Sequence, residues 1–107
     1  MITMLDSFWK VNPMISLPYR FALITGASSG IGEAIARELA RRNISVVLVA
    51  RSKDKLESLA NALRSDVVEA IAVPLDLTLP AADEILWNKL QELNIDIDLL
   101  VNNAGFG

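Results

Sequence analysis

The sequence of 107 residues contains no cysteine and no histidine. Their absence excludes disulfides, thiol nucleophiles, histidine general bases and zinc sites of the Cys/His type. Acid–base chemistry would have to use Tyr, Lys, Asp or Glu, and the sequence holds a single tyrosine, Tyr19. The net charge of −3 provides no basic surface for nucleic acid, so we expect no nucleic-acid partner.

Residues 1–19 also lack glycine and lack the charged start of an export signal. Polar residues such as Asp6 interrupt the apolar ones, so we expect neither a secretory signal nor a membrane span, and we expect a cytoplasmic protein. Met14 is an alternative start, which would make residues 1–13 an appendage. In another interpretation this segment forms a short helix that binds a membrane surface or a partner. The apolar side chains of that helix would be Leu5, Phe8, Trp9 and Val11.

Residues 25–32, TGASSGIG, form the most informative stretch, because they lie between an apolar run and an amphipathic segment. This order predicts a strand, a glycine turn and a helix. Backbone N–H groups at the start of such a helix bind a phosphate without any cationic side chain. We expect Gly26 to adopt a backbone angle closed to other residues, Gly30 to leave space for a pyrophosphate, and Gly32 to allow close helix-to-strand packing.

The spacing T-G-x-x-x-G-x-G resembles the cofactor loop of the short-chain dehydrogenases/reductases, and a second motif of that family, N-N-A-G, stands at residues 102–105. The resemblance implies an oxidoreductase whose nicotinamide cofactor contacts both motifs. The residues of the two motifs that we expect at the cofactor are Gly26, Ser28, Ser29, Gly30, Ile31, Gly32, Asn103, Ala104 and Gly105. A glycine turn without a ligand, and a structural role for Asn102 between two strands, are the alternatives.

The pattern of apolar residues predicts an α/β fold. Four nearly continuous apolar runs predict parallel strands that helices cover on both faces, at residues 21–25, 45–50, 69–75 and 98–102. Three amphipathic segments between them predict helices that end near residues 42, 64 and 93. These elements give a Rossmann-type doubly wound parallel sheet with the strand order 3-2-1-4, in a domain that spans residues 20–107.

Each predicted helix has an apolar face. Ser52 or Asp54 caps the second helix, and Pro80 opens the third at Ala81. Trp87 lies off the apolar stripe of the third helix. The side chains expected to face the sheet are Ile31, Ile35, Ala36 and Leu39 in the first helix and Leu56, Leu59, Ala60 and Leu63 in the second. In the third helix the mostly apolar face is formed by Ile85, Leu86, Lys89, Leu90 and Leu93.

The end of the second strand indicates which cofactor is preferred. NAD sites of this fold carry an acidic residue there that accepts hydrogen bonds from the ribose, whereas this sequence has Arg51 and Ser52. The guanidinium of Arg51 can bind a 2′-phosphate, with Ser52 and Lys55 as further donors. We therefore expect NADP(H) as the preferred cofactor and NAD(H) as the alternative. In the other interpretation, Arg51 and Lys53 are solvated residues at a strand–helix junction.

Asp76 and Leu77 follow the third strand. The resemblance implies that this Asp bonds the adenine amino group and that its neighbour shapes the adenine pocket. The residues alone fit a loop carboxylate that forms a turn equally well. Pro74, at the end of the same strand, is tolerated at or near a sheet edge.

The family's catalytic residues, a Ser, an Asn and a Tyr-x-x-x-Lys motif, follow N-N-A-G, and none of them occurs in these 107 residues. Tyr19 precedes the first strand and has Leu23 four residues later, so it does not match. We expect the cofactor-binding part of a truncated oxidoreductase, which would act on a small carbonyl or alcohol only in a completed chain. An NADP(H)-binding module without chemistry and a non-functional remnant are the alternatives. A methyltransferase-like site is disfavoured, because Arg51 replaces the acidic ribose partner.

The predicted fourth strand would lie at a sheet edge, where the N–H and C=O groups of residues 99–101 are open to pairing. We expect the 107-residue polypeptide to be marginally stable, to dimerise or to aggregate through this edge. Its thermal transition should then depend on protein concentration. A cooperative transition of a monomer at the same temperature at every concentration would contradict this prediction.

Overall fold

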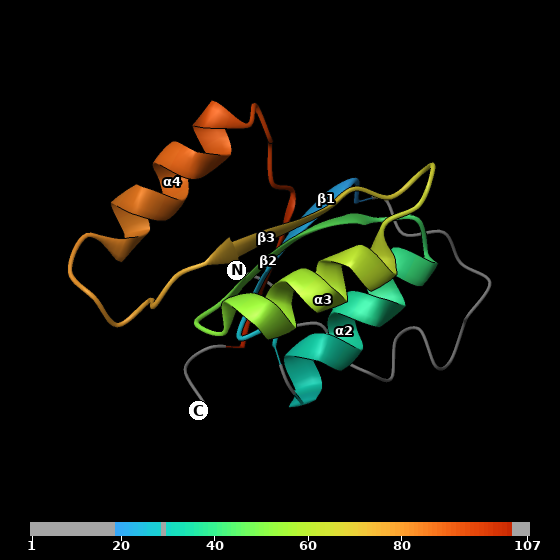
Figure 1. The fold of residues 1–107 in the computed structure, drawn as a ribbon. Helices are drawn as coiled ribbons and strands as arrows, with labels where there is room; N and C mark the ends of the chain where they lie inside the picture. The colour runs from blue at the N-terminus through green and yellow to red at the C-terminus, as the bar shows by residue number, and fades with distance from the viewer. Residues whose placement is uncertain (1–18, 29, 104–107) are drawn as a thin grey trace.

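The computed structural model describes residues 19–28 and 30–103. Its four strands form one parallel sheet in the order β3-β2-β1-β4, as the sequence predicts (Figure 1). The strands are β1 (Phe21–Thr25), β2 (Ser45–Ala50), β3 (Ala70–Pro74) and β4 (Leu99–Asn102). β3 lies at one edge of this sheet, which agrees with the position of Pro74.

Helices cover both faces of the sheet. α2 (Gly30–Arg41) and α3 (Lys53–Leu63) pack on one face, and α4 (Ala82–Glu92) packs on the other (Figure 1). Successive strand residues point to opposite faces, so Ala22 and Ile24 join the core under α2 and α3, and Leu23 joins the core under α4. Both faces are therefore buried, which explains the continuous apolar runs of β1 and β2.

Two helices end in the same way. Asn43 after α2 and Asn94 after α4 have φ values of 64° and 57°. In each case the residue after the asparagine donates its N–H to the carbonyl five residues earlier, at 3.0 Å, which satisfies the open C=O groups of the last turn. Asparagine is one of the few residues that tolerates this left-handed conformation.

Asp98 fixes the start of β1. Its carboxylate accepts the backbone N–H groups of Arg20 and Phe21, each at 3.0 Å, and its own N–H donates to the carbonyl of Phe21 at 3.1 Å. These bonds join the entrance of β1 to the entrance of β4, so the two strands begin in register.

Three predictions about helix faces are wrong. Ile31 is 67% exposed, because its neighbour Gly32 takes the buried position in the first turn of α2 and residue 31 lies about 100° further round the helix. Ile85 is 52% exposed for the same reason beside the buried Leu86, and Leu93, 38% exposed, lies at the C-cap of α4. Trp87 is 62% exposed, as predicted.

The predicted helix starts also need adjustment. α4 begins at Ala82, with Ala81 at its N-cap in a left-handed conformation at φ 65°, because a turn closed by the N–H of Ala82 and the carbonyl of Leu79 precedes the helix. Ser52 is the N-cap residue of α3, but its side chain makes no capping hydrogen bond, and Asp54 lies within the first turn.

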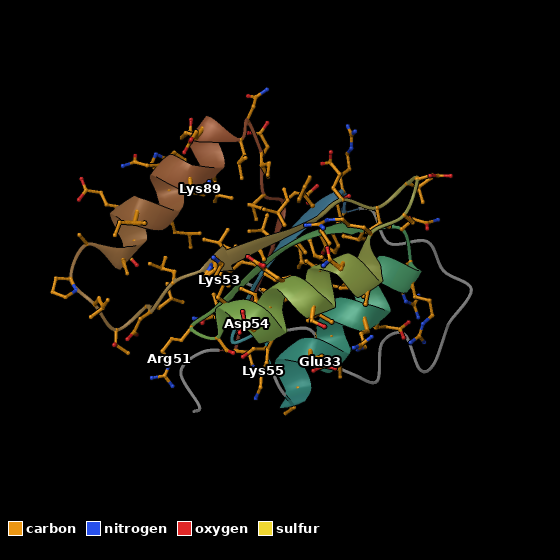
Figure 2. All side chains as sticks on the ribbon, in the orientation of Figure 1. Glu33, Arg51, Lys53, Asp54, Lys55 and Lys89 are labelled. Carbon is orange, nitrogen blue, oxygen red and sulfur yellow. The ribbon has the colours of Figure 1, made fainter. Side chains whose placement is uncertain are left out.

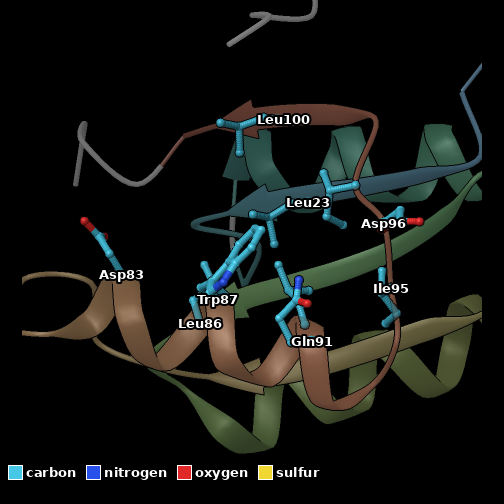
Figure 3. A pocket seen from close by; sticks show the side chains of 10 residues that line it. Leu23, Asp83, Leu86, Trp87, Gln91, Ile95, Asp96 and Leu100 are labelled. Atoms are coloured by element: carbon cyan, nitrogen blue, oxygen red, sulfur yellow. The ribbon is translucent and has the colours of Figure 1, made fainter.

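An apolar groove of about 380 Å³ runs between α4 and the strands β1 and β4 (Figure 3). Leu23 and Leu100 from the sheet face Trp87 from α4 across it, and Asp83 and Asp96 lie toward its ends. In the described part of the chain, no helix is long and apolar enough to cross a membrane.

Candidate cofactor-binding site

The residues predicted to bind the cofactor follow the carboxyl ends of four neighbouring strands, which meet at one edge of the sheet. Backbone hydrogen bonds join these ends. The N–H of Ala27 in the glycine turn donates to the carbonyl of Val49 at 3.2 Å, and the N–H of Leu75 donates to the carbonyl of Ala50 at 2.9 Å. The order of the strands reverses at β1, and ligands of open parallel sheets bind at such a switch point.

The glycine turn has the positive φ that the sequence predicts at Gly26, and a second one at Gly30 that was not predicted. Gly26 has a φ of 65° and Gly30 a φ of 58°, angles that other residues rarely adopt. A Cβ placed on Gly30 would meet no atom within 4 Å, so the backbone at the start of α2 is open on that side. Since the first N–H groups of a helix have no partner within it, this opening fits a phosphate group.

Gly32 provides a contact closer than the sequence indicates. A Cβ on this residue would lie 2.1 Å from the carbonyl oxygen of Gly26 and 2.9 Å from Nδ2 of Asn103. The glycine therefore allows α2 to approach the turn itself and the segment after β4, whereas the sequence predicts close packing on a strand.

Thr25 connects the two sequence motifs. Its buried hydroxyl accepts the backbone N–H of Asn103 at 2.9 Å and lies 3.0 Å from Oδ1 of Asn102, to which it donates. Nδ2 of Asn103 donates to the carbonyl of Gly26 at 3.3 Å. Asn102 thus ties β4 to β1, which is the structural interpretation of that residue. A role for Thr25 was not predicted from the sequence, although its place as the first residue of the T-G-x-x-x-G-x-G motif is a signal.

Arg51 lies directly after β2 with its side chain exposed. Figure 2 shows it extending away from the sheet beside the start of α3, where Lys53 and Lys55 also lie. Ser52 is half-buried. The arginine is therefore free of the core and accessible to a ligand at the strand end.

Asp76 forms a turn after β3. Its Oδ1 accepts the hydroxyl of Thr78 at 2.6 Å and the N–H of Thr78 at 2.9 Å. These two bonds, and to a smaller degree the positive charge of Arg51, hold the pKa of the Asp76 carboxyl below its usual range. Leu77 is partly buried and packs against the core under α4.

Of the remaining predicted residues, Ser28 is half-buried in the glycine turn and Ile31 stands exposed at the start of α2. Ser29, Ala104 and Gly105 lie outside the described residues, as does the whole N-terminal segment of residues 1–18. Among the described residues, no group of three or more acidic side chains is placed to hold a metal ion.

The parallel sheet, its switch point and the glycine turn define the chain as a Rossmann-like α/β protein. The chain belongs to the short-chain dehydrogenase family, whose family model, short chain dehydrogenase, matches residues 20–107. An uncharacterized oxidoreductase of Staphylococcus aureus (strain MRSA252) is 41% identical over 92 residues, which are 86% of this chain and 39% of the relative.

Two solved structures are also similar. A short-chain dehydrogenase from Sphingobium yanoikuyae in complex with NADPH is 46% identical with a TM-score of 0.71, over 80% of this chain and 34% of that one. The Pseudomonas aeruginosa RhlG/NADP active-site complex is 39% identical with a TM-score of 0.75, over 88% of this chain and 38% of that one. The chain therefore spans less than half the length of these proteins.

Proposed function

We propose that this chain binds NADP(H) and is the cofactor-binding part of a short-chain oxidoreductase. The observation that carries the proposal is the exposed Arg51 directly after β2, at the sheet edge that also holds the glycine turn. A guanidinium at this place favours a 2′-phosphate over a free ribose hydroxyl. The NADP and NADPH complexes of the similar structures support this choice, and NAD(H) is the weaker alternative.

Each part of the dinucleotide has a partner in this proposal. The pyrophosphate lies over the open backbone at Gly30 and the first turn of α2, where the exposed Ile31 also contacts it. Arg51 and Ser52 bind the 2′-phosphate. Asp76 accepts a hydrogen bond from the adenine amino group. Leu77 borders the adenine, and Ser28, Ser29 and residues 103–105 border the rest of the cofactor.

NADPH supplies a hydride, which the family's enzymes pass to a carbonyl carbon. The residues described here bind and orient the dinucleotide, and the 107-residue sequence contains no Tyr-x-x-x-Lys pair to move the proton. A small carbonyl or alcohol is accordingly a substrate only where further residues complete the site. We expect the 107-residue polypeptide to bind the cofactor without turning over carbonyl compounds.

The test is a titration of the 107-residue polypeptide with NADPH, followed by the fluorescence of the reduced nicotinamide, with NADH measured in parallel. We expect saturable binding of both, with NADPH bound at least tenfold more tightly, because one hydrogen bond to a charged group contributes about 1.5–3 kcal/mol. Binding of neither by a polypeptide with a folded circular dichroism spectrum would overturn the proposal. Tighter binding of NADH would support a dinucleotide site but would contradict the proposed preference for NADP(H).

A further inference from the structure

Thr78 donates two hydrogen bonds to one oxygen of the Asp76 carboxylate and leaves the other oxygen open. Both donors of Thr78, its hydroxyl and its backbone N–H, bind the same atom, Oδ1. Within the described part of the chain, Oδ2 accepts no hydrogen bond. Two bonds to one oxygen fix the rotation of the carboxyl group, so Oδ2 has a defined direction.

The position of this pair at the sheet edge is also defined. The N–H of Leu75 donates to the carbonyl of Ala50. Asp76 comes directly after Leu75 and Arg51 directly after Ala50, so this bond joins the two strand ends that carry them. The positive charge of Arg51 also lowers the pKa of the Asp76 carboxyl, to a smaller degree than the hydrogen bonds from Thr78. A ligand bound by Arg51 would therefore lie at the same strand ends as the open oxygen of Asp76.

We infer that Thr78 is a positioning residue for adenine recognition, which holds Oδ1 of Asp76 so that Oδ2 is presented to the adenine amino group. The inference rests on the proposed binding of NADP(H) and adds the residue that orients the Asp76 carboxylate for recognition of the base. An ionised carboxylate only accepts hydrogen bonds, and the 6-amino group of adenine donates them. Hypoxanthine carries an oxygen at that place, which accepts and would be repelled.

The low pKa of Asp76 supports the charged state that this recognition needs. The hydrogen bonds from Thr78 are the larger cause of the lowered pKa, and they favour the ionised carboxyl because a carboxylate is the better acceptor. The stabilisation that the carboxylate provides is present above the ordinary pKa of an aspartate and is lost as the pH falls through the lowered value. At neutral pH, Asp76 is an acceptor throughout.

The experiment compares NADPH with deamino-NADPH, in which hypoxanthine replaces adenine, on three forms of the full 107-residue chain. The wild-type chain should bind NADPH about tenfold or more tightly than deamino-NADPH. Thr78→Val removes the hydroxyl at similar size, and this ratio should fall severalfold, because only the backbone bond still orients the carboxylate. Thr78→Ser keeps the hydroxyl and should keep the wild-type ratio. The ratio of NADPH to NADH should be the same in all three, because Arg51 sets it.

A second readout follows the carboxyl group directly. The pKa of Asp76, measured by carbon NMR, should rise in Thr78→Val and stay low in Thr78→Ser. Since Thr78 is exposed, we expect all three forms to fold alike. A Thr78→Val chain with the wild-type ratio of NADPH to deamino-NADPH would overturn the inference, as would a wild-type chain that binds both equally. In both cases the NADP(H) site would stand, whereas a wild-type chain that binds no NADPH would overturn the inference and the proposed function together.

Discussion

Replacement of Gly32 by alanine should abolish dinucleotide binding and lower the free energy of unfolding by about 3 kcal/mol, the upper end of the usual cost of overpacking. The new Cβ would lie 2.1 Å from the carbonyl oxygen of Gly26, a backbone atom that no side-chain rotation can move away. α2 would have to withdraw from the turn and from Asn103, so the start of the helix would leave its place beside β1 and β4. Thermal unfolding and a titration with NADPH measure the two effects.

Gly30→Ala is the matched control, because the same atom is added two residues earlier. A Cβ on Gly30 meets no atom within 4 Å, so the cost is the left-handed backbone alone, about 1–2 kcal/mol. Its Cβ would occupy the open side of the turn where the proposed pyrophosphate lies. The free energy of NADPH binding should therefore fall by more than the free energy of unfolding. A Gly32→Ala chain that melts at the wild-type temperature would show that the close approach of α2 is not required.

Exchange of Arg51 for aspartate should reverse the cofactor preference. Loss of the guanidinium should weaken NADPH binding roughly 10- to 150-fold, since a hydrogen bond to a charged group contributes about 1.5–3 kcal/mol. The new carboxylate repels the 2′-phosphate and can accept the ribose hydroxyls of NADH. The ratio of the two dissociation constants should therefore change by about 100-fold or more in favour of NADH. Titrations of both cofactors at one ionic strength measure it, because salt screens exposed charges.

Lys53→Asp is the control for net charge. This substitution makes the same change of charge two residues further on, in the first turn of α3, where the side chain is also exposed. Its effect on the preference should be less than about threefold, because a screened surface charge contributes little without a direct contact. Equal effects of the two substitutions would mean that the general field of the surface, and not Arg51, selects the cofactor.

The strands could be predicted from the sequence, because continuous apolar runs mark strands that are buried on both faces. Their order was expected from the fold class. The faces of the helices were harder to predict. Ile85 and Leu86 are both apolar neighbours, and only the packing of α4 decides that Leu86 is buried and Ile85 exposed. A run of apolar residues near a helix end does not show where the stripe stops, so Leu93 was also misplaced.

The motifs of the candidate site could be predicted from the sequence, but the contacts between their residues could not. The glycine spacing predicts the positive φ of Gly26, because this angle is a local property of the turn, whereas the positive φ of Gly30 was not predicted. Contacts between segments far apart in the chain, such as the bond from Asn103 to Thr25, depend on the register of β1 with β4. The role of Thr78 could not be predicted for a different reason. A threonine two residues after an aspartate is common in turns, so its presence does not indicate a binding site.

The hydrogen bonds between Asp98 and the start of β1 support the pairing of β1 with β4. Of the three strand pairs in the described sheet, this pair is the furthest apart in sequence. β1 pairs with β2, and β2 with β3, across 24 positions, whereas β1 and β4 pair across 77. Closing the longer loop costs about 1 kcal/mol more in chain entropy. Such non-local contacts are the slow part of folding. The glycine turn and Asn103 come together only when β4 pairs with β1, and a cofactor that contacts both would stabilise that pairing.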